Sequence, residues 1–416
     1  MSDAELSRGR ALWRDRLPWL ILLRAFRPAI SARMLVCAGA GLAMTIAGWR
    51  LIWRMFAGSA DPLIKNLSGS VPGGEAIPQV WPAWPWGETL AGDPNTHLSL
   101  LEMLSRAGST VWQLTLPFQY LFHGNVGFSG AMFSILCGLW ALAVWSFLGG
   151  AMTRTFALQF TREETIPWRQ ARAFAMKHWF DYFTAPLYPL LGVLLAAVPV
   201  LVLGFFARWD FLALLVGLVW PLALFAGLFM AMLLLGLAVG WPLMWSTVSV
   251  EGNDAFDALS RSYAYVFRRP LQFLFYVVVA SVLGGLGYIL VQYFAEAVLH
   301  LTAWAASWGS GYERISNLNK LAIDSGPGYY AVLLFAFWNA LIRLIAAGFV
   351  ISYLWSATTA IYLLLRRDVD ATELDEIQLE QDERFGLPPL VTDDRGVPGA
   401  ADVVTSGESK PISEEG

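Results

Sequence analysis

The sequence predicts an all-α, polytopic integral membrane protein with about six transmembrane helices and two amphipathic helices at the inner membrane interface. Hydrophobic residues make up 56% of the chain and charged residues only 14%, whereas soluble domains carry roughly 25% charged residues. Several apolar runs exceed the roughly 18 residues that cross a bilayer as a helix. A transmembrane barrel would instead show alternating segments of about ten residues.

A repeated stretch supports the same fold class. Residues 171–186 and 255–270 align at an offset of 84 residues, and each copy ends at a proline that opens a long apolar run. In the second copy, Asn253 is the expected helix N-cap, and Asp257 and Arg261 have the i,i+4 spacing of an ion pair. Both copies carry one apolar stripe at helical spacing, so we expect two helices lying along the cytoplasmic interface.

The elements before the repeat follow from composition. Residues 1–32 are basic and aromatic, which predicts an interfacial N-terminus, and 34–56 form the first membrane helix. An outer loop over 57–127 contains prolines alternating with tryptophans at 81–86. This stretch is typical of the headgroup belt, while a polyproline-II ligand and a carbohydrate platform are the alternatives.

The remaining apolar runs predict five more membrane helices and a second outer loop. The run over 211–250 is long enough for two helices, but splitting it would place Arg261, Arg268 and Arg269 outside, against the positive-inside trend. We therefore expect one helix that bends near Pro221 and Pro242. The expected helices are 129–153, 187–206, 211–248, 271–295 and 340–365, with the second outer loop at 296–327.

The distribution of charge orients the chain. This arrangement places 17 Lys and Arg residues on inner segments and eight on outer ones, which favours cytoplasmic N- and C-termini. Residues 366–416 carry a net charge of −9 and the rest of the chain +5. The tail is expected to be largely disordered and solubilising, with binding of a protein partner as the alternative.

Several classes of function have no support in the sequence. The basic residues form no single patch, so nucleic-acid binding is not expected. No hydrolase, metalloprotease or phosphate-loop motif is present, which predicts neither a catalytic site nor a cofactor. His97, His123, His178 and His300 are dispersed, and Cys37 and Cys137 both fall in apolar runs. We therefore expect no metal site and no disulfide.

Two sets of charged residues are the candidate sites. Glu296 and Arg343 fall near the outer ends of their predicted membrane helices, where they could pair with each other, with Asn339 one turn before Arg343. The alternative is that both side chains snorkel to the interface. The second set would contact anionic lipid headgroups and comprises Lys177, Arg261, Arg268 and Arg269; the alternative is a purely structural role for the repeated helices.

Asp254–Tyr265 contains an acidic residue followed by the pattern A-x-x-x-S-x-x-Y before a membrane helix. With the layout of residues 33–365, this pattern resembles poorly characterised bacterial six-helix membrane proteins, similar to the membrane domain of some glycerophosphodiester phosphodiesterases. The resemblance implies a fold and a bacterial inner-membrane location. It implies no phosphodiesterase activity, because the catalytic domain is missing.

The sequence thus predicts a non-enzymatic membrane protein, either an envelope accessory component or a lipid-interacting protein. Its partners are the lipid bilayer and, through the tail or the outer loop, another protein. A transporter or permease for a small or lipophilic solute is the alternative. Transporters usually hold a polar cluster near the bilayer midplane, and the first four predicted helices have almost none.

Overall fold

The computed structural model describes residues 18–56, 58–59, 114–122, 127–162, 166–311 and 327–372, without the side chains of 18, 327–329, 332, 333 and 336. In this part of the chain every regular element is a helix. Six of these helices are long and apolar enough to cross a membrane. The predicted all-α, polytopic membrane fold is therefore confirmed.

The helices divide into long ones and short connecting ones. The long helices are α4 (Ala32–Phe56), α7 (Phe128–Thr161), α10 (Leu187–Phe206), α11 (Asp210–Glu251), α13 (Pro270–Ser310) and α15 (Pro327–Asp370). The short helices are η1 (Pro18–Leu20), α2 (Ile21–Arg24), α3 (Phe26–Ala29), α8 (Trp168–Lys177), α9 (Trp179–Thr184) and α12 (Ala255–Arg268). Residues 114–120 are also helical.

Three long helices extend past their expected ends. Helix α7 continues from 153 to Thr161, and α13 continues from 295 to Ser310. Helix α15 begins at Pro327 rather than 340. The expected outer loop over 296–327 is therefore helical over 296–310, and the sixth membrane helix starts 13 residues earlier than expected. The expected boundaries followed bilayer thickness, whereas a helix stops only where its hydrogen-bonding pattern is broken.

Helix α11 is one continuous helix with Pro221 and Pro242 inside it, in agreement with the one-helix interpretation of this run. The first repeat copy is broken at His178 into α8 and α9, while the second copy is the single helix α12. We call α8 and α9 together the first elbow, and α12 the second elbow. The N-terminal residues 1–17, most of the first outer loop and the tail from 373 lie outside the described residues.

The described part of the N-terminal segment packs against α15 with one of its faces. Leu22 is fully buried. The hydroxyl groups of Ser352 and Ser356 on α15 donate to the carbonyl oxygens of Ala29 and Ala25 at 2.8 and 2.7 Å. One face of residues 18–29 is therefore held against α15, while Leu23, Arg24 and Arg27 are exposed. The interfacial location of residues 1–32 stays a prediction.

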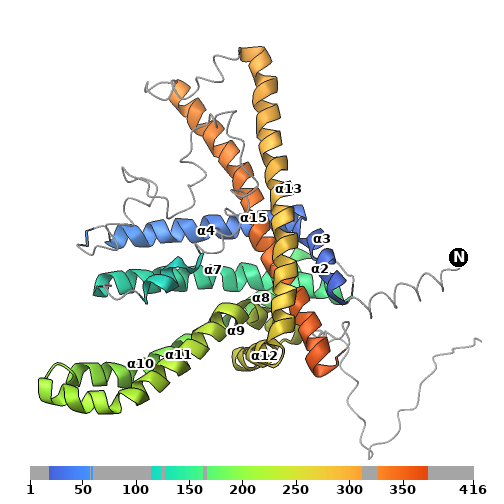
Figure 1. Cartoon of the computed structure of the whole chain (residues 1–416). Helices are drawn as coiled ribbons and strands as arrows, with labels where there is room; N and C mark the ends of the chain where they lie inside the picture. Colours follow the sequence, from blue (N-terminus) through green and yellow to red (C-terminus); the bar gives the residue numbers. More distant parts are fainter. Residues whose placement is uncertain are drawn as a thin grey trace, which may run out of the picture. The chain divides into compact units, whose positions relative to one another are not determined.

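The long helices pack as three antiparallel pairs, α4 with α7, α10 with α11, and α13 with α15 (Figure 1). Helix α15 also crosses α4, and the C-terminal parts of α7, α11 and α15 pack together. The largest fully buried side chains gather there, among them Trp245, Trp355 and Tyr182. The rings of Trp245 and Trp355 stack at 4.7 Å, so this meeting point is a closely packed aromatic core.

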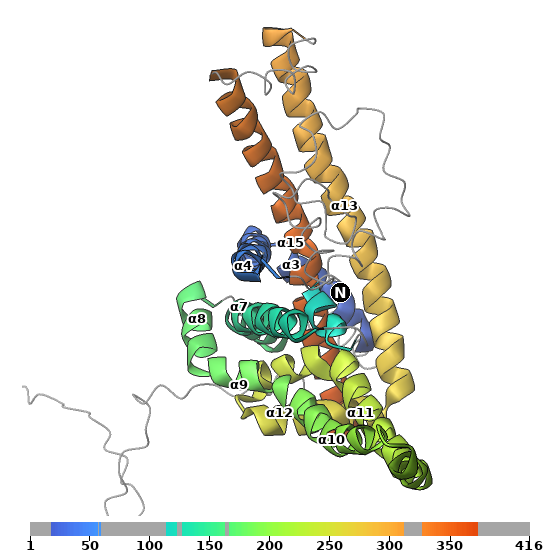
Figure 2. The same ribbon diagram turned by 90° about the vertical axis from the view of Figure 1, so that its left-hand side faces the viewer.

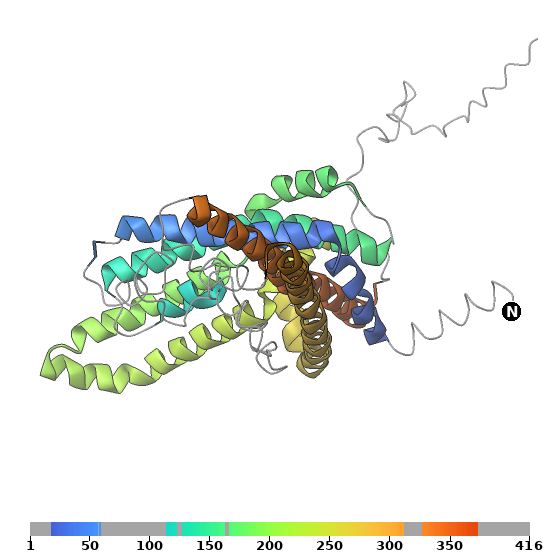
Figure 3. The same ribbon diagram turned by 90° about the horizontal axis from the view of Figure 1, so that it is seen from above.

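The hairpin of α10 and α11, drawn in yellow-green, projects away from this core (Figure 3). Its outer residues are almost all apolar and exposed, including Leu201, Leu218 and Phe225. An apolar hairpin of this length is stable only where lipid covers it. The hairpin is thus membrane-embedded, while the elbows α8, α9 and α12 gather beside α7 and α11 (Figure 2).

Candidate functional site

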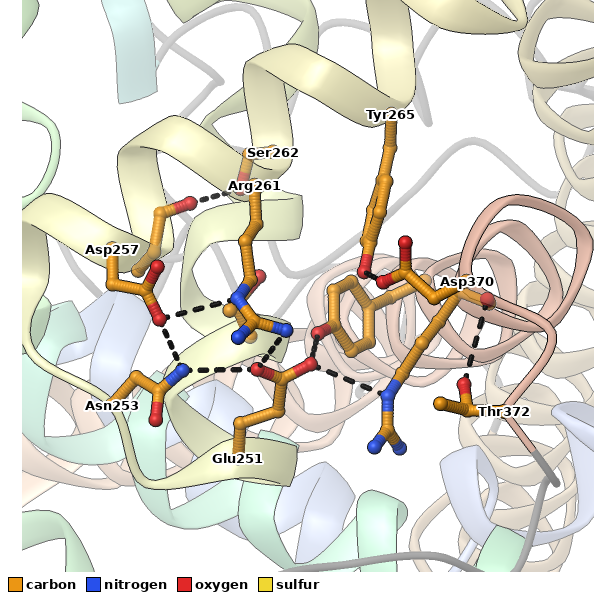
Figure 4. A network of polar contacts seen from close by, with 12 residues as sticks. Glu251, Asn253, Asp257, Arg261, Ser262, Tyr265, Asp370 and Thr372 are labelled. Atoms are coloured by element: carbon orange, nitrogen blue, oxygen red, sulfur yellow. Dashed lines mark hydrogen bonds and ion pairs between the residues drawn. The ribbon is translucent and has the colours of Figure 1, made fainter.

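The most polar site in the described structure centres on Glu251, the last residue of α11, whose side chain is 8% exposed. Its Oε2 accepts from Nη1 of Arg261 at 2.7 Å and from Nδ2 of Asn253 at 3.0 Å (Figure 4). Its Oε1 accepts from the Tyr362 hydroxyl at 2.5 Å and pairs with Nε of Arg366 at 3.3 Å. One carboxylate thus contacts two guanidinium groups, an amide and a hydroxyl.

The local sequence explains this arrangement. Gly252 adopts the left-handed conformation (φ 66°) that ends α11, a position where glycine carries no steric cost. The next helix is capped by Asp254, whose Oδ1 accepts from the backbone N–H of Asp257 at 3.1 Å. The predicted N-cap, Asn253, is wrong by one residue. Its side-chain amide instead donates to both Glu251 and Asp257, because it lies between the two carboxylates.

Arg261 connects the second elbow to this site. Its Nε donates to Asp257 at 3.1 Å, the i,i+4 pair that the sequence predicts, in addition to its bond with Glu251. Burial lowers the pKa of Arg261, but the charges of Glu251 and Asp257 raise the pKa by more. Two carboxylates thus neutralise this guanidinium. Arg261, predicted as a lipid contact, is instead paired with these two carboxylates and attaches α12 to the end of α11, although its side chain is 39% exposed.

The last turn of α15 is fixed to two further helices. Asp370 accepts from the hydroxyl of Tyr265 on α12, and Asp368 accepts from the hydroxyl of Tyr276 on α13 at 3.0 Å. Gln272 also donates to Asp368. Burial raises the pKa of Tyr265, and its hydrogen bond to Asp370 raises the pKa further. Tyr265 is therefore a proton donor over the physiological pH range.

A second buried network attaches the first elbow. The hydroxyl of Ser249 on α11 lies 2.5 Å from that of Thr153 on α7 and 2.8 Å from that of Tyr182 on α9. The indole N–H of Trp245 donates to the backbone carbonyl of Tyr182 at 2.8 Å. Because these hydroxyl groups hydrogen-bond to one another, none of them is left without a partner inside the apolar core. They hold α9 against α7 and α11.

Arg154 completes this second network. Only 4% of this residue is exposed. Its Nη1 donates to the carbonyl oxygen of Ser249 at 2.6 Å, and its guanidinium lies 4.0 Å from the ring centre of Phe174 on α8. Both elbows are therefore held by an arginine, Arg154 for the first and Arg261 for the second.

The other basic residues of the elbows face outward. On the first elbow, Arg169, Arg172 and Lys177 are exposed beside the exposed Met176. On the second, Arg268 and Arg269 are exposed beside Phe267. Cationic groups next to exposed apolar side chains are typical of a surface that lies in the headgroup region of a membrane. Of the predicted lipid contacts, Lys177, Arg268 and Arg269 thus lie on the surface.

The structure brings Glu296 and Arg343 together in a two-point ion pair between α13 and α15. Nε of Arg343 lies 3.1 Å from Oε1 of Glu296, and Nη2 lies 3.3 Å from Oε2. Gln292, one turn along α13, donates to the same Oε1 at 3.2 Å. The sequence predicted this pair near the outer ends of its helices. The pair instead lies well inside both helices, because α13 continues to Ser310 and α15 begins at Pro327.

Among the described residues, no group of three His, Cys, Asp or Glu side chains could hold a metal ion. Cys37 and Cys137 are both free thiols. His178 contacts Asp181 at 3.1 Å, while His97 and His123 lie outside the described residues. No family model, curated protein or solved structure matches the chain. The resemblance noted from the sequence therefore stays a prediction.

Sequence reasoning missed the Glu251 network and the role of Arg154. Glu251 is the one acidic residue between Asp210 and Asp254, directly at the end of an apolar run. A lone carboxylate at such a position indicates a partner of opposite charge. This signal could have identified Arg261, which is ten residues away. It could not have identified Tyr362 and Arg366, which are more than a hundred residues away in the chain.

Tyr263 provides a pH-dependent test of how the second elbow is docked. Its hydroxyl donates to the carbonyl oxygen of Leu233 at 2.7 Å, and burial raises the pKa of Tyr263 to about 12. The unfolded value is about 10, so the folded state retains the proton. The stability this provides is complete below pH about 10 and is lost as the pH rises through about 12.

We expect Tyr263→Phe to reduce this alkaline loss, at a cost of about 1 kcal/mol at neutral pH for the missing hydrogen bond. The measurement is the apparent thermal midpoint in detergent across that pH range. Tyr188→Phe, which changes an exposed tyrosine, is the matched control. An alkaline loss equal to that of the wild type would contradict the assignment.

Proposed function

We propose that this protein is a non-enzymatic component of a bacterial inner membrane that holds anionic phospholipids at its two elbows, on the cytoplasmic side. The observation that supports this function is the exposed set of basic and apolar side chains on the elbows, Arg169, Arg172, Met176, Lys177, Phe267, Arg268 and Arg269. Arg261 is not included, because Glu251 and Asp257 already bind its guanidinium.

The way the helix ends meet supports a common side for both elbows. Nη1 of Arg33, at the start of α4, donates at 3.3 Å to the carbonyl oxygen of Ile166, just after α7. The end of α11 contacts the end of α15 through Glu251 and Arg366. The end of α15 contacts the start of α13 through Asp368. The positive-inside rule then favours the cytoplasm for this side and for both termini.

Neutralising Arg268 and Arg269 together tests the proposal. Each basic residue near an anionic surface contributes about 1 kcal/mol, so two contribute a factor of roughly 30 in affinity. We expect Arg268→Gln/Arg269→Gln to raise, by about that factor, the phosphatidylglycerol concentration that gives half-maximal thermal stabilisation of the purified protein in neutral detergent.

The matched control is Arg208→Gln, which changes an exposed arginine in the turn between α10 and α11, at the other end of those helices. It should leave the phosphatidylglycerol dependence unchanged, and phosphatidylcholine should stabilise both proteins weakly. If the double variant and the wild type respond alike to phosphatidylglycerol, headgroup binding at the second elbow is wrong.

Transport of a small or lipophilic solute is the second candidate function. One observation favours it: Glu296, Arg343 and Gln292 form a polar group between two membrane-spanning helices. The packing at the centre of the protein favours the first candidate instead. A Cβ atom on Gly149 would lie 2.6 Å from the Trp245 ring, and one on Gly150 would lie 2.7 Å from the Tyr182 ring.

A further inference from the structure

The depth of the Glu296–Arg343 pair follows from the lengths of its helices. Glu296 lies 14 residues before the end of α13 at Ser310, about 21 Å along the helix. Arg343 lies 16 residues after the start of α15 at Pro327, about 24 Å along the helix. The pair is therefore well inside the helix pair.

The residues beyond the pair are those that prefer lipid and its interface. Leu301, Trp304 and Trp308 on α13 are exposed, as are Tyr330 and Trp338 on α15. Exposed Trp and Tyr side chains mark the headgroup level of a bilayer. Trp304 and Trp308 are 8 and 12 residues from Glu296, or about 12 and 18 Å along the helix. The ion pair thus lies in the hydrocarbon region, below the outer headgroup level.

At that depth the pair remains accessible from outside the protein. The side chains of Arg343 and Glu296 are 29% and 30% exposed. Arg343 uses Nε and one Nη2 hydrogen in its bonds to Glu296; its Nη1 group makes no hydrogen bond to another described residue. Asn339, one turn nearer the tip of α15, and His300, one turn nearer the tip of α13, extend the row of polar side chains outward.

Donors left without partners in hydrocarbon are costly, so they attract a polar group that can enter from the bilayer. A zwitterionic phospholipid headgroup has the complementary chemistry. Its phosphate matches the unused guanidinium hydrogens of Arg343, and its ammonium group matches the Glu296 carboxylate. Its acyl chains match the exposed leucines and aromatic rings on either side.

We propose that Gln292, Glu296 and Arg343 form an intramembrane binding site for a zwitterionic phospholipid headgroup, and that this site lowers the barrier to movement of lipid between leaflets. The inference rests on the proposed lipid-interacting function and names a second lipid class and an activity for it. The seam of Gln292, Glu296 and His300 on α13 with Asn339 and Arg343 on α15 would supply polar contacts along the path.

The test is transbilayer movement in proteoliposomes. Full-length protein is reconstituted with a fluorescent phosphatidylethanolamine, and dithionite is added to reduce the probe in the outer leaflet. Wild-type protein should allow reduction beyond the outer-leaflet fraction. Glu296→Gln and Arg343→Gln should each slow this movement about tenfold, the effect of losing one charge-assisted contact. Arg208→Gln should match the wild type.

A structural role for the pair must be separated from headgroup binding. The double exchange Glu296→Arg/Arg343→Glu keeps the ion pair and should retain most of the rate, and gel filtration reports whether each variant is folded. Glu296→Gln, which leaves an unopposed cation, should also shift preference toward fluorescent phosphatidylglycerol. A purely structural pair would not change lipid selectivity.

Two results would overturn the inference: wild-type protein that moves lipid no faster than empty liposomes, and folded Glu296 and Arg343 variants with wild-type rates and selectivity. Neither result depends on Arg268 and Arg269. Failure here together with phosphatidylglycerol binding at the second elbow would therefore leave the proposed function standing, and the opposite pattern would reject that function alone.

Discussion

Replacing Glu251 by alanine is expected to destabilise the folded protein by about 3–5 kcal/mol, the range measured when one partner of a buried ion pair is removed. The carboxylate is 8% exposed and accepts from Arg261 and Tyr362 while pairing with Arg366. Its loss leaves these cationic and hydroxyl groups with fewer acceptors in a poorly hydrated site. The end of α11 would then lose its polar attachment to both α12 and α15.

The measurement is the apparent thermal midpoint, at fixed detergent and protein concentrations because unfolding of such proteins is commonly irreversible. Glu251→Gln keeps the size of the side chain and should be less harmful than Glu251→Ala. Combining Glu251→Gln with Arg366→Gln should cost less than the two separate losses added together. Asp210→Asn, at the exposed start of α11, is the control. A wild-type midpoint for Glu251→Ala would refute the role of the network.

The fold class could be predicted because its signal is local. An apolar run of sufficient length indicates a membrane helix, whatever the rest of the chain contains. The boundaries were less predictable for the same reason. In α13 the helix is longer than a bilayer is thick. The local sequence does not indicate at which residue the helix leaves the bilayer.

The two elbows were predictable as amphipathic helices, since each carries its own apolar stripe. Which of their arginines face outward was not. Arg261 and Arg268 are seven residues apart, on nearly the same side of an ideal helix. Only the tertiary position of Glu251 pairs Arg261 with the end of α11, and that position depends on how α11 ends at Gly252.

The Glu296–Arg343 contact was predictable as a possibility, because isolated charges in apolar helices tend to find each other. The depth of the pair in the membrane was not predictable, because it depends on the helix lengths, and the predicted helices were too short. With the observed lengths, the pair lies away from the helix ends and within the hydrocarbon region. This changes its interpretation from two snorkelling side chains to a candidate lipid site.

The crossing of α4 and α15 is the second place where a small change should have a large effect. A Cβ atom added to Gly348 would lie 2.7 Å from the carbonyl oxygen of Leu35 and 2.8 Å from the backbone nitrogen of Gly39. Backbone atoms cannot rotate away as a flexible side chain can. By contrast, a Cβ atom added to Gly236, Gly284 or Gly287 would meet side-chain rings.

Gly348→Ala should therefore force α4 and α15 apart at the crossing where α15 also binds the N-terminal helices. We expect a loss of about 3 kcal/mol, at the upper end for overpacking a core, seen as a lower thermal midpoint and earlier aggregation on gel filtration. Gly217→Ala is the matched control, because no atom lies within 4 Å of the added Cβ. Alanine favours the helix over glycine by about 1 kcal/mol, so this variant should be at least as stable as the wild type. Equal stability of the two alanine variants would mean that the α4–α15 crossing is looser than described, and that the docking of residues 18–29 onto α15 does not depend on it.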